Sequence, residues 1–143
     1  MLSKQQLAIF NSITTPLGNE LTWRWDAEFS ALLTEFSWEK KVRVLQVLQQ
    51  LFSEQWHKGN IKKAPKVLHT ELAELAQLNK NQLIFTRRAN HKTPALALIW
   101  WPWGHGSTYS MRIKILNGNY NDEDLRQGKT RLFSKVLKAF QRR

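Results

Sequence analysis

Apolar residues recur along the chain with two different periods, and these periods divide it into helical and extended segments. A spacing of three to four residues behind a polar capping residue predicts helices. The predicted helices cover residues 3–15, 26–36, 37–58 and 67–78. Strict alternation predicts strands at 19–26, 93–103 and 107–116, and a glycine-containing loop joins the last two strands as a β-hairpin.

The order of these elements predicts an α+β fold: a mainly helical single domain with a late antiparallel β-hairpin and a C-terminal basic helix. The helical part is expected at 1–92, the hairpin at 93–116 and the terminal helix at 122–143. A length of 143 residues without repeats or a long linker fits one domain. Residues 79–88 leave two interpretations open, a short helix capped by Asn79 or a strand built on Leu83 and Phe85.

The formal net charge of +11 is distributed unevenly along the chain. Residues 1–57 carry a net charge of −1, whereas residues 58–143 carry +12, and no acid occurs from Leu75 to Asn121 or after Asp124. A self-repelling surface of this kind favours a polyanionic partner. Nucleic acid is the first expectation, an anionic membrane surface the second and an acidic protein the third. A charge that only improves solubility is the alternative.

Several classes of chemistry are not supported by the residues. The chain has no cysteine, and its four histidines (His57, His69, His91 and His105) lack the spacing of metal ligands. No nucleophile motif, phosphate loop or catalytic pair of carboxylates is found, so we expect no enzymatic activity, no cofactor and no metal. The longest apolar stretch, Ala95 to Trp103, is about half of a membrane crossing, so no transmembrane segment and a cytoplasmic location are expected.

The stretch Thr70-Glu-Leu-Ala-Glu-Leu-Ala-Gln-Leu-Asn-Lys-Asn-Gln-Leu83 resembles the helix-turn-helix and winged-helix family of DNA-binding proteins. Ala73 matches the small residue where the two helices meet, and Leu78 and Leu83 match apolar positions of that motif. The resemblance implies a second helix capped at Asn79, with the later hairpin as the wing. It also implies that four residues face the DNA groove: Asn79, Lys80, Asn81 and Arg88.

A second resemblance is to RNA chaperones of the ProQ/FinO type. It rests on the basic loop that leads to Ala64-Pro65-Lys66-Val67, on the turn at 78–83 and on Leu116-Asn-Gly118 before a basic helix. It implies binding of structured RNA by a basic face.

The sequence Trp100-Trp101-Pro102-Trp103 lies near several cations, a combination that proteins use to bind single strands. Alternation places Trp100 and Trp101 on opposite faces of their strand. Trp103, at the hairpin tip, is predicted to be exposed and to contact the partner. The tryptophans on periodic apolar faces are predicted to be core residues: Trp23, Trp38 and Trp56.

These observations predict a non-enzymatic nucleic-acid-binding protein, with DNA favoured over RNA, that uses a basic surface in the C-terminal two-thirds of the chain. The expected contact residues are Asn79, Lys80, Asn81, Arg87, Arg88, Lys92, Trp103 and Arg112. The alternative is an assembly factor that binds a protein partner through the Trp-rich hairpin or the amphipathic terminal helix. The oligomeric state stays open.

Overall fold

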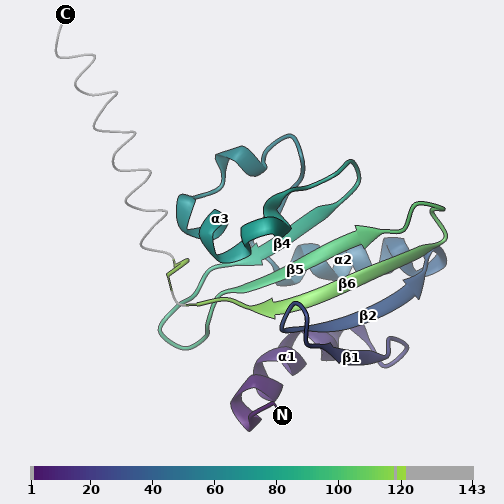
Figure 1. Ribbon diagram of the computed structural model, residues 1–143. Coiled ribbons are helices and arrows are strands. Elements are labelled where there is room, and N and C mark those ends of the chain that lie inside the picture. The colour runs from purple at the N-terminus through teal and green to yellow at the C-terminus, as the bar shows by residue number, and fades with distance from the viewer. Residues whose placement is uncertain (1, 118, 122–143) are drawn as a thin grey trace, which may run out of the picture.

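A six-stranded antiparallel sheet forms the centre of the computed structural model, which describes residues 2–117 and 119–121 (Figure 1). The strand order is β1-β2-β6-β5-β4-β3. The elements are α1 (Lys4–Leu17), β1 (Trp23–Asp26), β2 (Ala31–Ser37), η1 (Trp38–Lys40), α2 (Lys41–Leu51), β3 (Glu54–Trp56), η2 (Ile61–Lys63), α3 (Lys66–Leu72), η3 (Ala73–Ala76), β4 (Leu83–Arg87), β5 (Leu96–Pro102) and β6 (Thr108–Ile115).

The fold is not mainly helical, which corrects the fold class expected from the sequence: about 35% of it is helix and 30% is strand. The largest error lies at 26–36, expected as a helix, where a turn leads into β2. Leu33 and Phe36 are both buried, although alternation places them on opposite faces of the strand. Because β2 buries side chains on both faces, its apolar residues lose the period of two and imitate helical spacing.

The helices α1 and α2 cover one face of the sheet, behind the strands in the view of Figure 1. Alternate residues of the central strands point into this layer, among them Phe85, Leu98 and Met111. Ile13 of α1 and Leu48 of α2 pack against them and are fully buried. This layer is the larger of the two hydrophobic cores.

On the opposite face, η2, α3 and η3 cover β3, β4 and β5. Ala97 and Ile99 point into this second core, where the small side chain of Ala97 leaves room for Leu68 and Leu72 of α3. Over β6, β2 and β1 the same face carries polar and charged side chains instead. We call this the open half-face; it presents Arg24, Asp26, Glu35, Ser110, Arg112 and Lys114.

Several elements agree with the sequence prediction. The helix α1 begins with the expected capping box, in which Ser3 Oγ accepts from the backbone of Gln6 at 3.1 Å, although the helix continues through Pro16 to Leu17. The strand β1 and the β5–β6 hairpin are confirmed. The helix expected at 37–58 is shorter, because α2 ends at Leu51 and the chain then enters strand β3.

The segment that follows α3 is a strand rather than a helix. The helix expected to reach residue 78 ends at Leu72, and η3 follows it. Asn79–Asn81 form a turn with Asn81 at φ 72°, and β4 then buries Ile84 and Phe85 on opposite faces. Residues 79–88 therefore do not form the second helix implied by the winged-helix resemblance, and the strand interpretation is correct. The helix expected at 122–143 lies outside the described residues.

Candidate binding face

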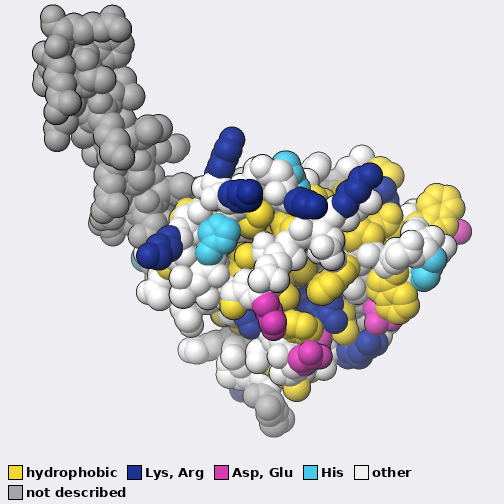
Figure 2. Space-filling model, turned by 45° about the horizontal axis from the view of Figure 1, so that its top comes forward, with side chains coloured by type: hydrophobic (Ala, Val, Ile, Leu, Met, Phe, Trp, Pro, Cys, Tyr) yellow, Lys and Arg dark blue, Asp and Glu magenta, His cyan; other side chains and the backbone are white. Residues whose placement is uncertain are grey.

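Four exposed lysines gather on the segment from the end of β3 to the first residue of α3. We call them the lysine cluster: Lys58, Lys62, Lys63 and Lys66. No acid occurs between Glu54 and Glu71 in the sequence, and none of the four makes an ion pair with a residue that the structure describes. Figure 2 shows Lys and Arg side chains along the upper margin of this face of the molecule. The cluster is a site of unneutralised positive charge.

The segment that carries the lysines is fixed by hydrogen bonds of its own. The backbone N–H of His57 donates to Oδ1 of Asn60 at 2.7 Å, and Nδ2 of Asn60 donates to the Gln55 carbonyl at 3.2 Å. Ile61 and Ala64 are buried in the second core on either side of the two central lysines. The backbone that carries the lysines is therefore held in place before any ligand binds, which lowers the entropy cost of binding.

A groove of about 510 Å³ lies at the end of the β5–β6 hairpin, on the face of the sheet that also carries α3. We call it the aromatic groove; its principal side chains are Phe29, Trp101, Trp103, His105 and Arg112. Trp103 is 43% exposed, and its ring meets that of His105 edge-on with centroids 5.8 Å apart. This combination of aromatic faces, a cation and an imidazole suits a flat, partly polar ligand.

Arg112 organises the floor of the aromatic groove. Its guanidinium lies 5.0 Å from the ring centroid of Phe29 and 5.7 Å from that of Trp101, and its Nε donates to Oδ2 of Asp26 at 2.9 Å. The hydrogen bond from Arg112 is the main cause that lowers the pKa of Asp26. Lys114 donates to the Phe29 carbonyl at 2.7 Å. Together these contacts hold the β1–β2 loop against the open half-face.

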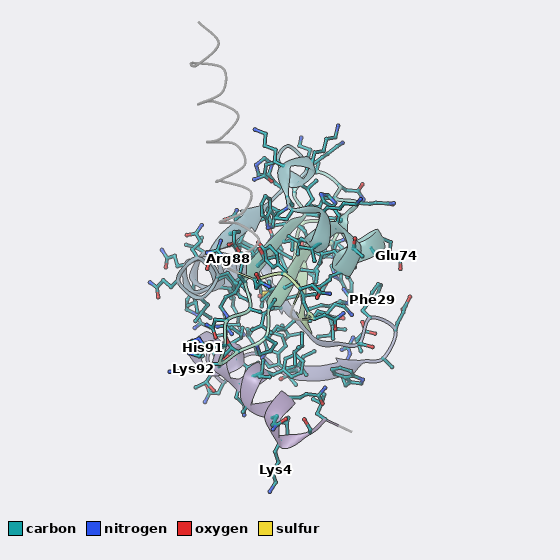
Figure 3. All side chains as sticks on the ribbon, turned by 90° about the vertical axis from the view of Figure 1, so that its left-hand side faces the viewer. Lys4, Phe29, Glu74, Arg88, His91 and Lys92 are labelled. Carbon is teal, nitrogen blue, oxygen red and sulfur yellow. The ribbon has the colours of Figure 1, made fainter. Side chains whose placement is uncertain are left out.

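A second pocket, of about 300 Å³, lies between the β1–β2 loop and η3. We call it the acidic pocket; it is lined by Glu28, Phe29, Glu74, Leu75, Gln77, Leu78, Gln82, Ile99 and Trp101. Figure 3 labels Phe29 and Glu74 on the same side of the molecule. Phe29 and Trp101 line both the acidic pocket and the aromatic groove, so the two cavities are neighbours.

The structure brings together only two of the eight contact residues predicted from the sequence: Trp103 and Arg112 both line the aromatic groove. The three residues of the exposed turn before β4 do not line this groove: Asn79, Lys80 and Asn81. The backbone N–H of Asn79 donates to Oε1 of Gln82 at 2.8 Å, so this turn is closed on itself.

The other three predicted residues lie at the far end of β4. Arg88 forms an ion pair with Glu54, and burial lowers the pKa of Arg87. Figure 3 labels Arg88 and Lys92 on the side away from Phe29. These cations do not share a surface with the aromatic groove.

A buried polar network lies beside Arg88 and ties β3 to β4. Thr86 Oγ1 accepts from the indole N–H of Trp56 at 2.9 Å and lies 3.0 Å from Oε2 of Glu54. The hydroxyl of Tyr120 lies 3.4 Å from the same Thr86 oxygen. Burial raises the pKa of Tyr120 to about 12. Since Thr86 and Tyr120 are fully enclosed, this network stabilises the fold and has no access for a substrate.

Sequence reasoning missed the lysine cluster and Phe29 as site residues. The sequence did show an acid-free basic loop at residues 58–66, which is the signal that could have identified the lysine cluster. Phe29 was instead assigned to the inner side of a helix that does not form. The expectation that Trp38 is a core residue is wrong, because it is 58% exposed. Trp23 and Trp56 are half-buried against the two cores, and Trp100 and Trp101 lie on opposite faces as predicted.

Across residues 2–117 and 119–121, no group of three or more His, Asp or Glu side chains could hold a metal ion. The helices in these ranges are too short or too polar to cross a membrane. Comparison with protein-family models, with curated proteins and with solved structures finds no match to this chain. The function is therefore argued from the geometry of the binding face.

Proposed function

We propose that this protein binds single-stranded nucleic acid without catalysing a reaction. The observation that carries the proposal is the lysine cluster, four exposed lysines on a hydrogen-bonded segment without ion-pair partners among the described residues. They lie on the same side of the sheet as the aromatic groove, because η2, α3 and Trp101 all belong to the second core. Lysine–phosphate contacts and base stacking are the two contributions that single-strand binding requires.

The aromatic groove supplies the stacking surface in this proposal. Trp103 offers an exposed ring, and Trp101 offers a half-buried ring beside the guanidinium of Arg112. Every base has a face that stacks on such rings, so we expect weak dependence on base sequence. The preference for DNA rested on the second helix that the winged-helix resemblance implied after Asn79. The strand β4 (Leu83–Arg87) lies there instead. We therefore propose a single-stranded ligand with either sugar.

The test compares fluorescein-labelled 15-nucleotide oligo(dT) and oligo(rU) with a duplex of equal length, by fluorescence anisotropy. We expect both single strands to bind more tightly than the duplex. A variant carrying Lys62→Gln and Lys63→Gln loses two phosphate contacts. Each contact contributes about 0.7 to the slope of log K against log salt concentration, so this loss predicts roughly 25-fold weaker binding at about 0.1 M salt. Lys4→Gln with Lys41→Gln is the control, because it removes the same charge from exposed residues of α1 and α2. Equal losses in both variants would contradict the proposal.

A protein partner bound through the Trp-rich hairpin is the second candidate function, favoured by the exposure of Trp103 at the tip. The two candidates differ in their dependence on salt. Binding to nucleic acid weakens steeply as salt displaces the protein from phosphates, whereas an aromatic contact with a protein changes little.

A further inference from the structure

Two carboxylates face one pocket on a protein that is otherwise strongly basic. The described residues hold fifteen Lys and Arg side chains and eight Asp and Glu side chains. Four of these acids are in ion pairs: Glu20, Asp26, Glu35 and Glu54. Glu28 and Glu74 are exposed, have no ion-pair partner among the described residues and line the acidic pocket from opposite sides.

The wall between these carboxylates is apolar and aromatic. Phe29 and Trp101 present rings to the pocket, and Leu75 and Ile99 complete its apolar lining. No lysine or arginine is among the residues that line it. A cation that entered this pocket would meet two carboxylates and no competing cation among the lining residues.

We propose that the acidic pocket binds an arginine or lysine side chain of a protein segment. The chain of methylene groups would lie on the apolar wall formed by Phe29, Leu75 and Trp101. Glu28 and Glu74 would accept hydrogen bonds from the charged group, and the fork of a guanidinium suits carboxylates better than an ammonium does. This inference shares Trp101 and the aromatic groove with the proposed binding of nucleic acid. It does not rest on that function, since Glu28 and Glu74 carry it and the lysine cluster does not.

The adjoining cavity indicates a protein segment rather than a free amine. The acidic pocket and the aromatic groove share Phe29 and Trp101, so a ligand in one cavity can continue into the other. Neighbouring residues of an extended segment lie about 3.3–3.6 Å apart along the chain, which lets an apolar or aromatic side chain beside the cation enter the groove. A polyamine carries no group that would fill a groove of about 510 Å³.

The experiment uses the full chain and a fluorescein-labelled peptide, Gly-Ser-Phe-Arg-Leu-Ser-Gly, followed by anisotropy. Its comparison peptides replace Arg by Gln, or Phe and Leu by Ser, and spermidine serves as an unlabelled competitor. The protein variant carries Glu28→Gln and Glu74→Gln. Glu39→Gln is the matched control, because Glu39 is an exposed acid of η1 that does not line the pocket. Thermal melting curves establish that each variant is folded.

We expect the Arg peptide to bind at least ten-fold more tightly than either comparison peptide. The double variant should lose this preference, the Glu39 control should keep it, and binding of oligonucleotides to the double variant should not fall. Equal affinity for the Arg and Gln peptides, or unchanged peptide affinity in the double variant, would overturn the proposal. Spermidine that displaces the peptide at equal concentration would also overturn it, by identifying a small polyamine as the ligand.

Discussion

Trp100 and Trp103 lie three residues apart on the same hairpin, and their replacement by alanine should have opposite consequences. Trp100 is 2% exposed and packs among Phe36 and Tyr109, with ring centroids 5.6 and 5.1 Å away. Trp103 is 43% exposed, and its ring meets that of His105 within the hairpin tip. We expect Trp100→Ala to affect folding and Trp103→Ala to affect binding.

The surface area that each tryptophan buries sets the loss of folding stability expected when alanine replaces it. A tryptophan buries about 200 Å² when fully covered, and at about 25 cal/mol per Å² the loss for Trp100→Ala is about 5 kcal/mol. Trp103 is covered over a little more than half of its surface, which gives an upper bound of about 3 kcal/mol. Its real cost is smaller, since neighbours within the tip stay close in the unfolded chain. Loss of one stacked base should weaken binding by about 1–3 kcal/mol.

Urea unfolding followed by fluorescence gives the two stabilities, and anisotropy with labelled oligo(dT) gives the two affinities. Trp100→Phe is a second variant that keeps part of the packing, in case Trp100→Ala does not fold. The expected pattern is a stable Trp103→Ala with weak binding and a destabilised Trp100 variant whose folded fraction binds normally. If Trp103→Ala unfolds as readily as Trp100→Ala while keeping its affinity, the hairpin tip is structural and the stacking surface is refuted.

Three further predictions concern the network and the lysine segment. Thr86→Val removes the acceptor for the buried indole N–H of Trp56 and should cost about 1–3 kcal/mol in urea unfolding; no loss would contradict the network. The pKa of Tyr120 rises from 10.0 to about 12, so the folded protein favours the neutral phenol. The contribution of Tyr120 to stability is complete below pH 10 and is lost as the pH rises toward 12. Melting curves should show this loss in the unmodified protein and not in Tyr120→Phe. Gly59→Ala would place Cβ 2.8 Å from Cε1 of His57, so we expect a stability loss below about 1 kcal/mol together with weaker oligonucleotide binding, and unchanged affinity would mean that the loop geometry is unimportant.

The parts of the fold that the sequence predicts well are those with one clear period. The capping box at Ser3 and the alternation of β6 each specify their element locally, and the structure agrees. Strands β2 and β4 were harder to predict from the sequence because each buries side chains on both faces. The alternation that identifies a half-exposed strand is therefore missing. Only the tertiary partners of Leu33 and Ile84 distinguish such a strand from a helix.

The candidate site was predictable in composition and less so in position. The excess of positive charge after residue 57 was evident, yet four of the five cations predicted as contacts do not line the aromatic groove. Phe29 enters the groove because Asp26 binds Arg112, a contact between residues 86 positions apart. Periodicity carries no information about a contact of that kind, and the pairing of Glu28 with Glu74 across one pocket is equally non-local.

The salt dependence of oligonucleotide affinity tests the central proposal most directly. Four phosphate contacts by the lysine cluster predict that log K for single strands falls with log salt concentration at a slope of about −2.8 or steeper. The variant with Lys62→Gln and Lys63→Gln should show a slope shallower by about 1.4, and the variant with Lys4→Gln and Lys41→Gln should match the unmodified protein. A slope near zero, or one that the Lys62 and Lys63 changes leave unaltered, would contradict the account.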